Sequence, residues 1–73
     1  METINYATGR DYGMPQVLEI HFTPTDDCMV DVPATFTDAS RGISGTVKVF
    51  GFCANRQDIG KAVLAEYDAG RYI

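Results

Sequence analysis

The sequence predicts a small α+β domain, in which an antiparallel sheet of three to four strands packs against one C-terminal helix. Apolar and polar residues alternate in several segments up to Phe52, which is the pattern of half-buried strands. Short runs rich in glycine, proline and aspartate separate these segments, and such runs favour turns. Beyond Asn55 the apolar residues instead recur every three or four positions, as they do on one face of a helix.

The first two strands are predicted on either side of a glycine-containing loop. Residues 2–8 place Ile4 and Tyr6 in alternation with polar neighbours, which predicts a short first strand. Residues 9–13 hold two glycines and break the alternation. Residues 16–23 form the clearest strand pattern, whose apolar face consists of Leu18, Ile20 and Phe22.

The third and fourth strands are predicted at residues 30–37 and 46–52, joined by a polar connection at 38–45. Pro33 lies within the third strand and has no backbone N–H to donate. Because each backbone N–H of a central strand has an acceptor on one neighbouring strand or the other, Pro33 predicts an edge strand at 30–37.

The helix is predicted to begin after Asn55, whose side chain suits the N-cap position. Gly70 stands where the residue after a helix often adopts positive φ, so the helix should end just before it. The order is thus β-β-β-β-α in one domain that spans residues 1–73. The face of the helix predicted to be buried consists of Ile59, Ala62, Val63 and Tyr67.

Composition narrows the classes of function. The 73 residues carry a formal net charge of −4, which disfavours direct binding of nucleic acid and suits a protein partner with a basic surface. The N-terminal residues lack the pattern of a signal peptide, and the longest apolar run is far too short to span a membrane. A cytoplasmic protein is therefore predicted, without membrane association.

Catalytic and metal-binding residues are sparse. His21 is the single histidine and lies opposite the apolar face of its predicted strand. Cys28 and Cys53 stand alone, without the spacing of a zinc site or a redox pair, and are predicted to be unpaired thiols. A disulfide between them is the alternative in an oxidising compartment. The sequence therefore predicts no enzyme, no metal and no cofactor. A small enzyme that uses His21 and a cysteine is the least favoured alternative.

Charge segregation offers the candidate partner-binding residues. Carboxylates are concentrated between Asp26 and Asp38, where there is no basic residue, whereas basic residues prevail from Arg41 to Lys61. Tyrosines near chain ends and loops are often contact residues. The residues predicted to bind a partner are Asp26, Asp27, Asp31, Tyr6 and Tyr12.

By elimination, the sequence predicts a protein-binding module. Its small size and acidity favour an inhibitor of the kind that bacteriophages and other mobile elements encode, such as an anti-CRISPR protein. Such a protein would occlude the basic channel in which a host complex handles nucleic acid. The alternative is a structural or adaptor module that forms homo-oligomers, in which the edge strand at 30–37 pairs with its copy.

Overall fold

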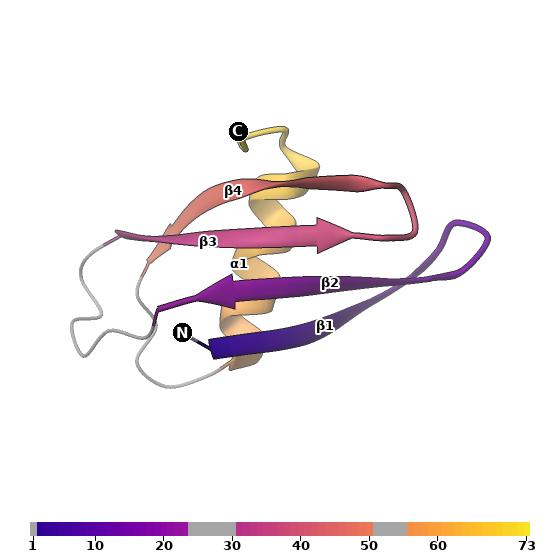
Figure 1. Ribbon diagram of the computed structural model, residues 1–73, viewed down its shortest axis with the longest axis horizontal. Helices are drawn as coiled ribbons and strands as arrows, with labels where there is room; N and C mark the ends of the chain where they lie inside the picture. The colour runs from indigo at the N-terminus through magenta and orange to yellow at the C-terminus, as the bar shows by residue number, and fades with distance from the viewer. Residues whose placement is uncertain (1, 24–30, 51–55) are drawn as a thin grey trace.

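The described part of the chain forms four strands and one helix (Figure 1). The computed structural model describes residues 2–23, 31–50 and 56–73. Every strand pairs antiparallel with its neighbour in the sequence, so the order across the sheet is β1-β2-β3-β4. The predicted α+β class, with a C-terminal helix on an antiparallel sheet, is confirmed. The elements are β1 (Glu2–Asp11), β2 (Pro15–Phe22), β3 (Asp31–Asp38), β4 (Ile43–Phe50) and α1 (Arg56–Asp68).

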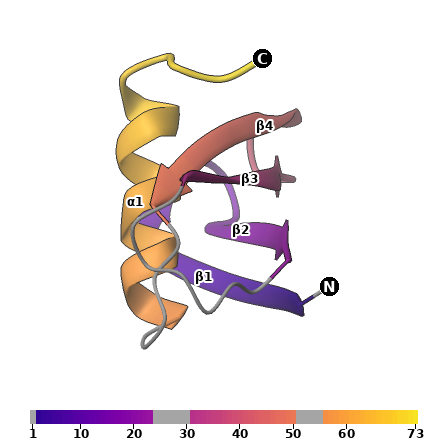
Figure 2. The ribbon, with the colours of Figure 1, turned by 90° about the vertical axis from the view of Figure 1, so that its left-hand side faces the viewer.

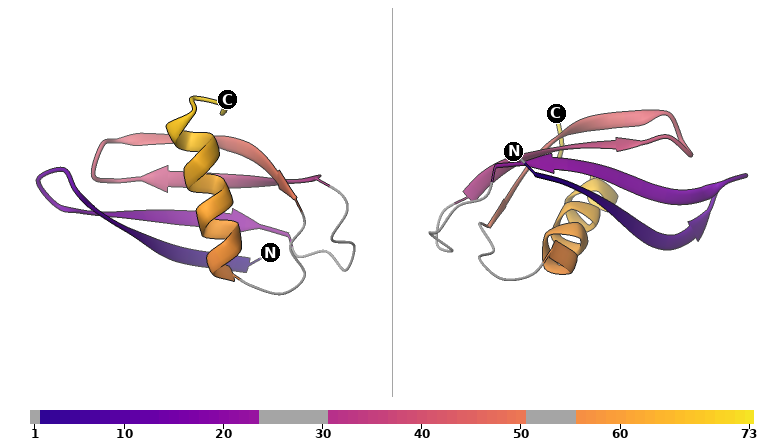
Figure 3. Two further views of the ribbon diagram at one scale, coloured as in Figure 1. Left: turned by 180° about the vertical axis from the view of Figure 1, so that it is seen from behind. Right: turned by 60° about the horizontal axis from the view of Figure 1, so that its bottom comes forward.

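The helix α1 covers one face of the sheet, crossing it from β1 to β4 (Figures 2 and 3). The side chains of β2 alternate between buried and solvent-facing positions, as expected for a sheet covered on one side only. No element in the described part of the chain covers the opposite face, which is called the open face below.

The core lies between the sheet and α1, and the predicted apolar faces of β2 and α1 form much of it. Burial of each large apolar side chain contributes about 1.5–3 kcal/mol to folding. Ala62 of the predicted helix face is half-buried rather than fully buried. The buried apolar residues are Leu18, Ile20, Phe22, Ala34, Phe36, Val47, Val49, Ile59, Val63 and Tyr67.

The prediction that Pro33 marks an edge strand is wrong, because β3 lies between β2 and β4. Pro33 pairs with Lys48 of β4, whereas pairing with β2 ends one residue later in β3, at Ala34. The backbone N–H and C=O of Thr46 point away from β3, because both bond to Ile73. Backbone groups alternate in direction along a strand, so those of Lys48, two residues later, also point away from β3. The nitrogen of Pro33 therefore points past the end of β2, where no donor is needed.

Two glycines mark places where the backbone is approached closely. Gly45 lies inside β4, which begins three residues earlier than predicted, and a Cβ there would meet the Tyr72 ring at 2.8 Å. Gly60 lies inside α1, and a Cβ there would clash with the Tyr6 ring. Both glycines allow an aromatic ring to pack directly on the backbone.

The chain after α1 returns to the sheet. Gly70 has a φ of 73°, as predicted for the residue that ends the helix. Its N–H donates to the Tyr67 carbonyl, and the Arg71 N–H donates to that of Glu66, the two bonds of a Schellman motif. The Tyr72 ring then packs against Phe36 and Tyr67. The predicted cap, Asn55, lies outside the described residues.

Candidate protein-binding surface

The β1–β2 hairpin ends in a tip that extends beyond the β3–β4 turn (Figure 1). Asp11 pairs with Pro15, and the Tyr12 N–H donates to the Met14 carbonyl at 3.1 Å, which closes the turn. The Asp11 carboxylate accepts the Gly13 N–H at 2.9 Å, and Gly13 has a φ of 87° that other residues rarely adopt. The tip is therefore a closed, hydrogen-bonded turn.

Two large side chains are exposed on this hairpin tip. Tyr12 is 45% exposed and Met14 is 48% exposed. Tyrosine and methionine are both enriched in protein–protein contacts, and each offers a broad apolar surface. The tip thus presents an aromatic ring and a thioether to solvent from a hydrogen-bonded turn.

A buried carboxylate is hydrogen-bonded to β2 close to the hairpin tip. Asp38, at the end of β3, is fully buried and accepts hydrogen bonds from Gln16 Nε2 at 2.7 Å and from the Tyr67 hydroxyl at 2.8 Å. The backbone N–H and hydroxyl of Ser40 donate to its other oxygen. The Gln16 Oε1 in turn accepts the hydroxyl of Thr8 at 2.7 Å. This network joins β1, β2, β3, the β3–β4 turn and α1.

The electrostatics of this network favour an ionised Asp38. Burial acts to raise the pKa of Asp38, but the hydrogen bonds from Ser40, Gln16 and Tyr67 outweigh it and hold the pKa below its usual value. The phenol of Tyr67 behaves in the opposite way. Burial, together with its bond to Asp38, raises the pKa of Tyr67 to about 12. Asp38 is therefore an anion surrounded by neutral donors.

Two arginines attach the tip to the rest of the molecule. The Arg41 guanidinium lies 5.1 Å from the centre of the Tyr12 ring and 5.8 Å from that of Tyr67, within the range of cation–π attraction. Arg10 donates two hydrogen bonds of 2.8 Å to Asp68 at the end of α1. That pairing raises the pKa of Arg10 and lowers the pKa of Asp68.

The structure does not bring the predicted contact residues together. Tyr12 is exposed at the hairpin tip, whereas Tyr6 is half-buried against Gly60 of α1. Asp31 is exposed, but it begins β3 at the end of the sheet opposite the tip (Figure 1). Asp26 and Asp27 lie outside the described residues.

Sequence reasoning missed Asp38 and Gln16, both of which were assigned no role in the core. A signal for each was present in the alternation. Asp38 continues the buried series of Ala34 and Phe36, and Gln16 precedes Leu18 on the buried face of β2. A polar residue at a core position of an amphipathic strand predicts a buried hydrogen-bond network.

Of the residues considered for catalysis, His21 is the one that the structure describes. His21 lies on the open face, where its Nδ1 is 2.9 Å from the Thr3 hydroxyl and its Nε2 is 3.8 Å from Glu19. No group of three or more His, Cys, Asp and Glu side chains gathers among the described residues. Cys28 and Cys53 lie outside them.

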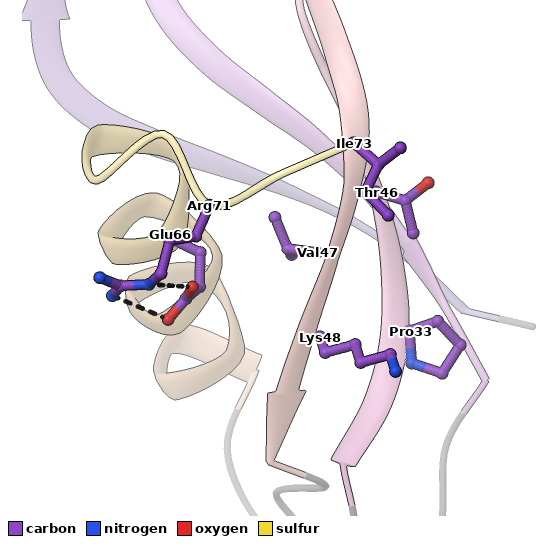
Figure 4. A pocket seen from close by; sticks show the side chains of 7 residues that line it. All are labelled: Pro33, Thr46, Val47, Lys48, Glu66, Arg71 and Ile73. Atoms are coloured by element: carbon purple, nitrogen blue, oxygen red, sulfur yellow. Dashed lines mark hydrogen bonds and ion pairs between the residues drawn. The ribbon is translucent and has the colours of Figure 1, made fainter.

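A groove of about 270 Å³ lies between β4 and the end of α1 (Figure 4). Arg71 closes one side of it through two hydrogen bonds to Glu66. Ile73 occupies the neighbouring edge of β4 by exchanging two backbone bonds with Thr46. The segment after α1 therefore forms part of the wall of the groove. Its lining consists of Pro33, Thr46, Val47, Lys48, Glu66, Arg71 and Ile73.

Comparisons with protein families, curated proteins and solved structures found no match. No helix in the described part of the chain has the length and apolar character needed to span a bilayer.

Proposed function

We propose that this chain is a protein-binding module and that the β1–β2 hairpin tip is its contact. The observation that carries the proposal is the exposure of Tyr12 and Met14 on a hairpin tip that contacts with the β3–β4 turn and α1 hold in place. Isolated exposed apolar residues are common on protein surfaces, but these two share one closed turn.

The support beneath the tip makes it suited to binding. Ordering a flexible loop on association costs free energy, and a contact ordered in advance avoids that cost. Here the Arg41–Tyr12 stacking and the Arg10–Asp68 pair fix the tip to the β3–β4 turn and to α1. Binding energy in protein interfaces is concentrated in a few aromatic and arginine residues, which are the residue types present.

The net charge of the chain supports a partner with a basic surface. Of the carboxylates in the predicted acidic segment, Asp31 is exposed at one end of the open face, and Glu19 lies on the same face. Our more specific proposal is an inhibitor of the kind that bacteriophages encode. An anti-CRISPR-like protein of this charge would act in the host cytoplasm by occluding a nucleic-acid-handling complex. Its support is the small size and acidity of the chain.

The test begins with capture of the partner from a host lysate, its identification and purification. Affinity for the purified partner is then measured for the wild type and for a Tyr12→Ala/Met14→Ala variant. We expect the double variant to bind at least about tenfold more weakly, since truncation of a hot-spot residue costs about 2 kcal/mol or more and tenfold corresponds to about 1.4 kcal/mol. Ile73→Ala is the matched control, because Ile73 is 99% exposed and lies at the edge of β4. Equal affinity for all three proteins would contradict the tip as the contact.

The contribution of acidic residues is measured separately, by reversal of Asp26, Asp27 and Asp31 to Lys. If the partner is basic, the triple variant should associate more slowly, and the difference should shrink as salt is raised. An unchanged association rate at low salt would contradict a basic partner surface while leaving the tip contact intact.

A further inference from the structure

The two edges of the sheet differ in how they are protected. At the β4 edge, Thr46 exchanges two backbone hydrogen bonds with Ile73, and the next residue with the same orientation is Lys48. A covering segment and an edge lysine are both common means by which proteins prevent unwanted strand pairing. The β4 edge is therefore protected against pairing with another strand.

The β1 edge lacks these protections. Residues 3–9 of β1 carry no charged side chain and no proline. Pairing with β2 is regular from Glu2 to Ala7, and the irregularity in β1 comes only after Ala7. No described element pairs with the outer side of this strand. A long, regular and uncharged edge is a template for another strand.

The pairing register fixes which backbone groups of β1 face outward. In an antiparallel ladder, the N–H and C=O of one residue point to the same side, and successive residues alternate. Thr46 points away from β3, so its partner Thr35 points towards β2, and His21 of β2 points towards β3. The partner of His21 on β1 is Thr3, which must point outward. Asn5 and Ala7 share that orientation.

We propose that β1 pairs with β1 of a second copy of this chain about a two-fold axis at Asn5. In this register Asn5 faces Asn5 of the second copy, and Thr3 faces Ala7. Each of these outward-facing pairs exchanges two backbone hydrogen bonds. The two sheets then join into one continuous antiparallel sheet.

The side chains of β1 are compatible with this pairing. On the helix side, Ile4 of one copy lies opposite Tyr6 of the other, and both are half-buried at the rim of the core. Pairs of an aromatic and a β-branched residue across strands are stabilising. On the open face, the facing pairs consist of threonine, asparagine and alanine, so no like charges meet. The strand is thus complementary to itself, and this is the reason for proposing a second copy rather than an unrelated strand.

The first test is the mass in solution, measured by light scattering across protein concentrations. The wild type should approach twice the chain mass of 8.0 kDa as concentration rises. Asn5→Pro removes an N–H that points to solvent in one copy but bonds across the two-fold axis in a pair, so this variant should remain monomeric. Ser44→Pro is the matched control. Its N–H points outward on β4, two residues before Thr46, and the variant should still dimerise.

A second variant guards against misfolding of Asn5→Pro. Asn5→Lys places two like charges opposite one another at the axis, while Asn5 is exposed in the single chain. This variant should be folded by circular dichroism and monomeric, with partial recovery of the dimer at high salt. A wild type that stays monomeric up to about 1 mM overturns the proposal, as does a dimer that persists in both Asn5 variants.

Hydrogen exchange distinguishes pairing through β1 from any other dimer. The amides of Thr3, Asn5 and Ala7 should become protected as concentration rises, whereas those of Ile4 and Tyr6 are bonded to β2 at every concentration. Protection that fails to alternate along β1 would show that a different surface associates. Tyr12 and Met14 lie outside this edge, so the result is independent of the hairpin-tip contact.

Discussion

Asp38 joins several parts of this molecule. Its carboxylate accepts hydrogen bonds from Gln16, from Tyr67 and from Ser40, so that strands, a turn and the helix meet at one anion. A buried charge is costly when it loses its partners, and the same applies to donors that lose their acceptor. The position of the hairpin tip therefore depends on a side chain that is itself fully buried.

Replacement of Asp38 should be severely destabilising. Asp38→Asn keeps the shape of the side chain but leaves buried donors facing an amide, and we expect a loss of about 3 kcal/mol in the free energy of unfolding. Urea denaturation followed by circular dichroism measures it. Asp31→Asn is the control on the exposed end of the same strand and should change stability by less than about 0.5 kcal/mol. A loss for Asp38→Asn as small as the loss for Asp31→Asn would show that the Asp38 network contributes little.

Exposure of single residues was only partly predictable from the sequence. The prediction for Tyr12 was successful: the glycines on either side of it mark a turn, and the Tyr12 side chain is exposed there. Tyr6 was predicted as a contact, but its ring fills the space left by Gly60, which is distant in the sequence. The alternation of β3 does place Asp38 on the buried face, but it does not identify Gln16 and Tyr67 as the donors, which are distant in the sequence.

At the scale of elements, the close packing of α1 on β1 determines where the helix crosses the sheet. Gly60 allows the Tyr6 ring to lie against the helix backbone, which brings the first turns of α1 over β1. A larger residue at this position would lift the helix from the edge of the sheet. Local helix propensity and tertiary packing therefore make opposite demands at Gly60.

These opposite demands predict whether Gly60→Ala raises or lowers the stability of the protein. Gly60→Ala should gain up to about 1 kcal/mol from helix propensity, but the added methyl group clashes with Tyr6 and costs about 1–3 kcal/mol. We expect a net loss of stability in thermal or urea unfolding. In a Tyr6→Leu background the same substitution should cost less, and a double-mutant cycle measures that coupling. A more stable Gly60→Ala protein would show that the ring moves aside freely.

The elements themselves were predictable to a greater extent than their arrangement. Alternation identified all four strands, and the spacing of Ile59, Val63 and Tyr67 identified the buried face of the helix. The order of strands was not readable in this way, since Pro33 is equally compatible with an edge strand and with a central strand beyond the end of its neighbour. The start of β4 was also predicted late, because Gly45 appeared to belong to a turn rather than to a ring contact.

At the scale of the whole molecule, stability should depend on pH through the same buried carboxylate. The folded chain holds the pKa of Asp38 below the ordinary value of 3.8. Well above pH 3.8 the group is ionised in both states, and its stabilising contribution is complete. As the pH falls below 3.8, the unfolded chain takes up the proton first, so unfolding becomes progressively easier until the folded pKa is passed.

The corresponding measurement is the melting temperature between pH 7 and about pH 2. The wild type should lose stability most steeply below pH 3.8, and Asp38→Asn should show a shallower decline from a lower starting value. Glu66 and Asp68 also have lowered pKa values, but these exposed pairs with arginine contribute little. Parallel curves for the two proteins would place the acid sensitivity elsewhere.

The helix α1 is the last element in chain order, and it supplies one whole side of the core. On the ribosome, the strands emerge first and can form their hairpins one after another, because every strand pairs with its neighbour in the sequence. Until α1 has also emerged, however, Leu18, Ile20 and Phe36 have nothing to cover them. The nascent chain is then a sheet with an exposed apolar face, the kind of species that chaperones bind and that aggregates. Synthesis of this protein therefore passes through a short interval of vulnerability, which ends only when the helix closes over the sheet.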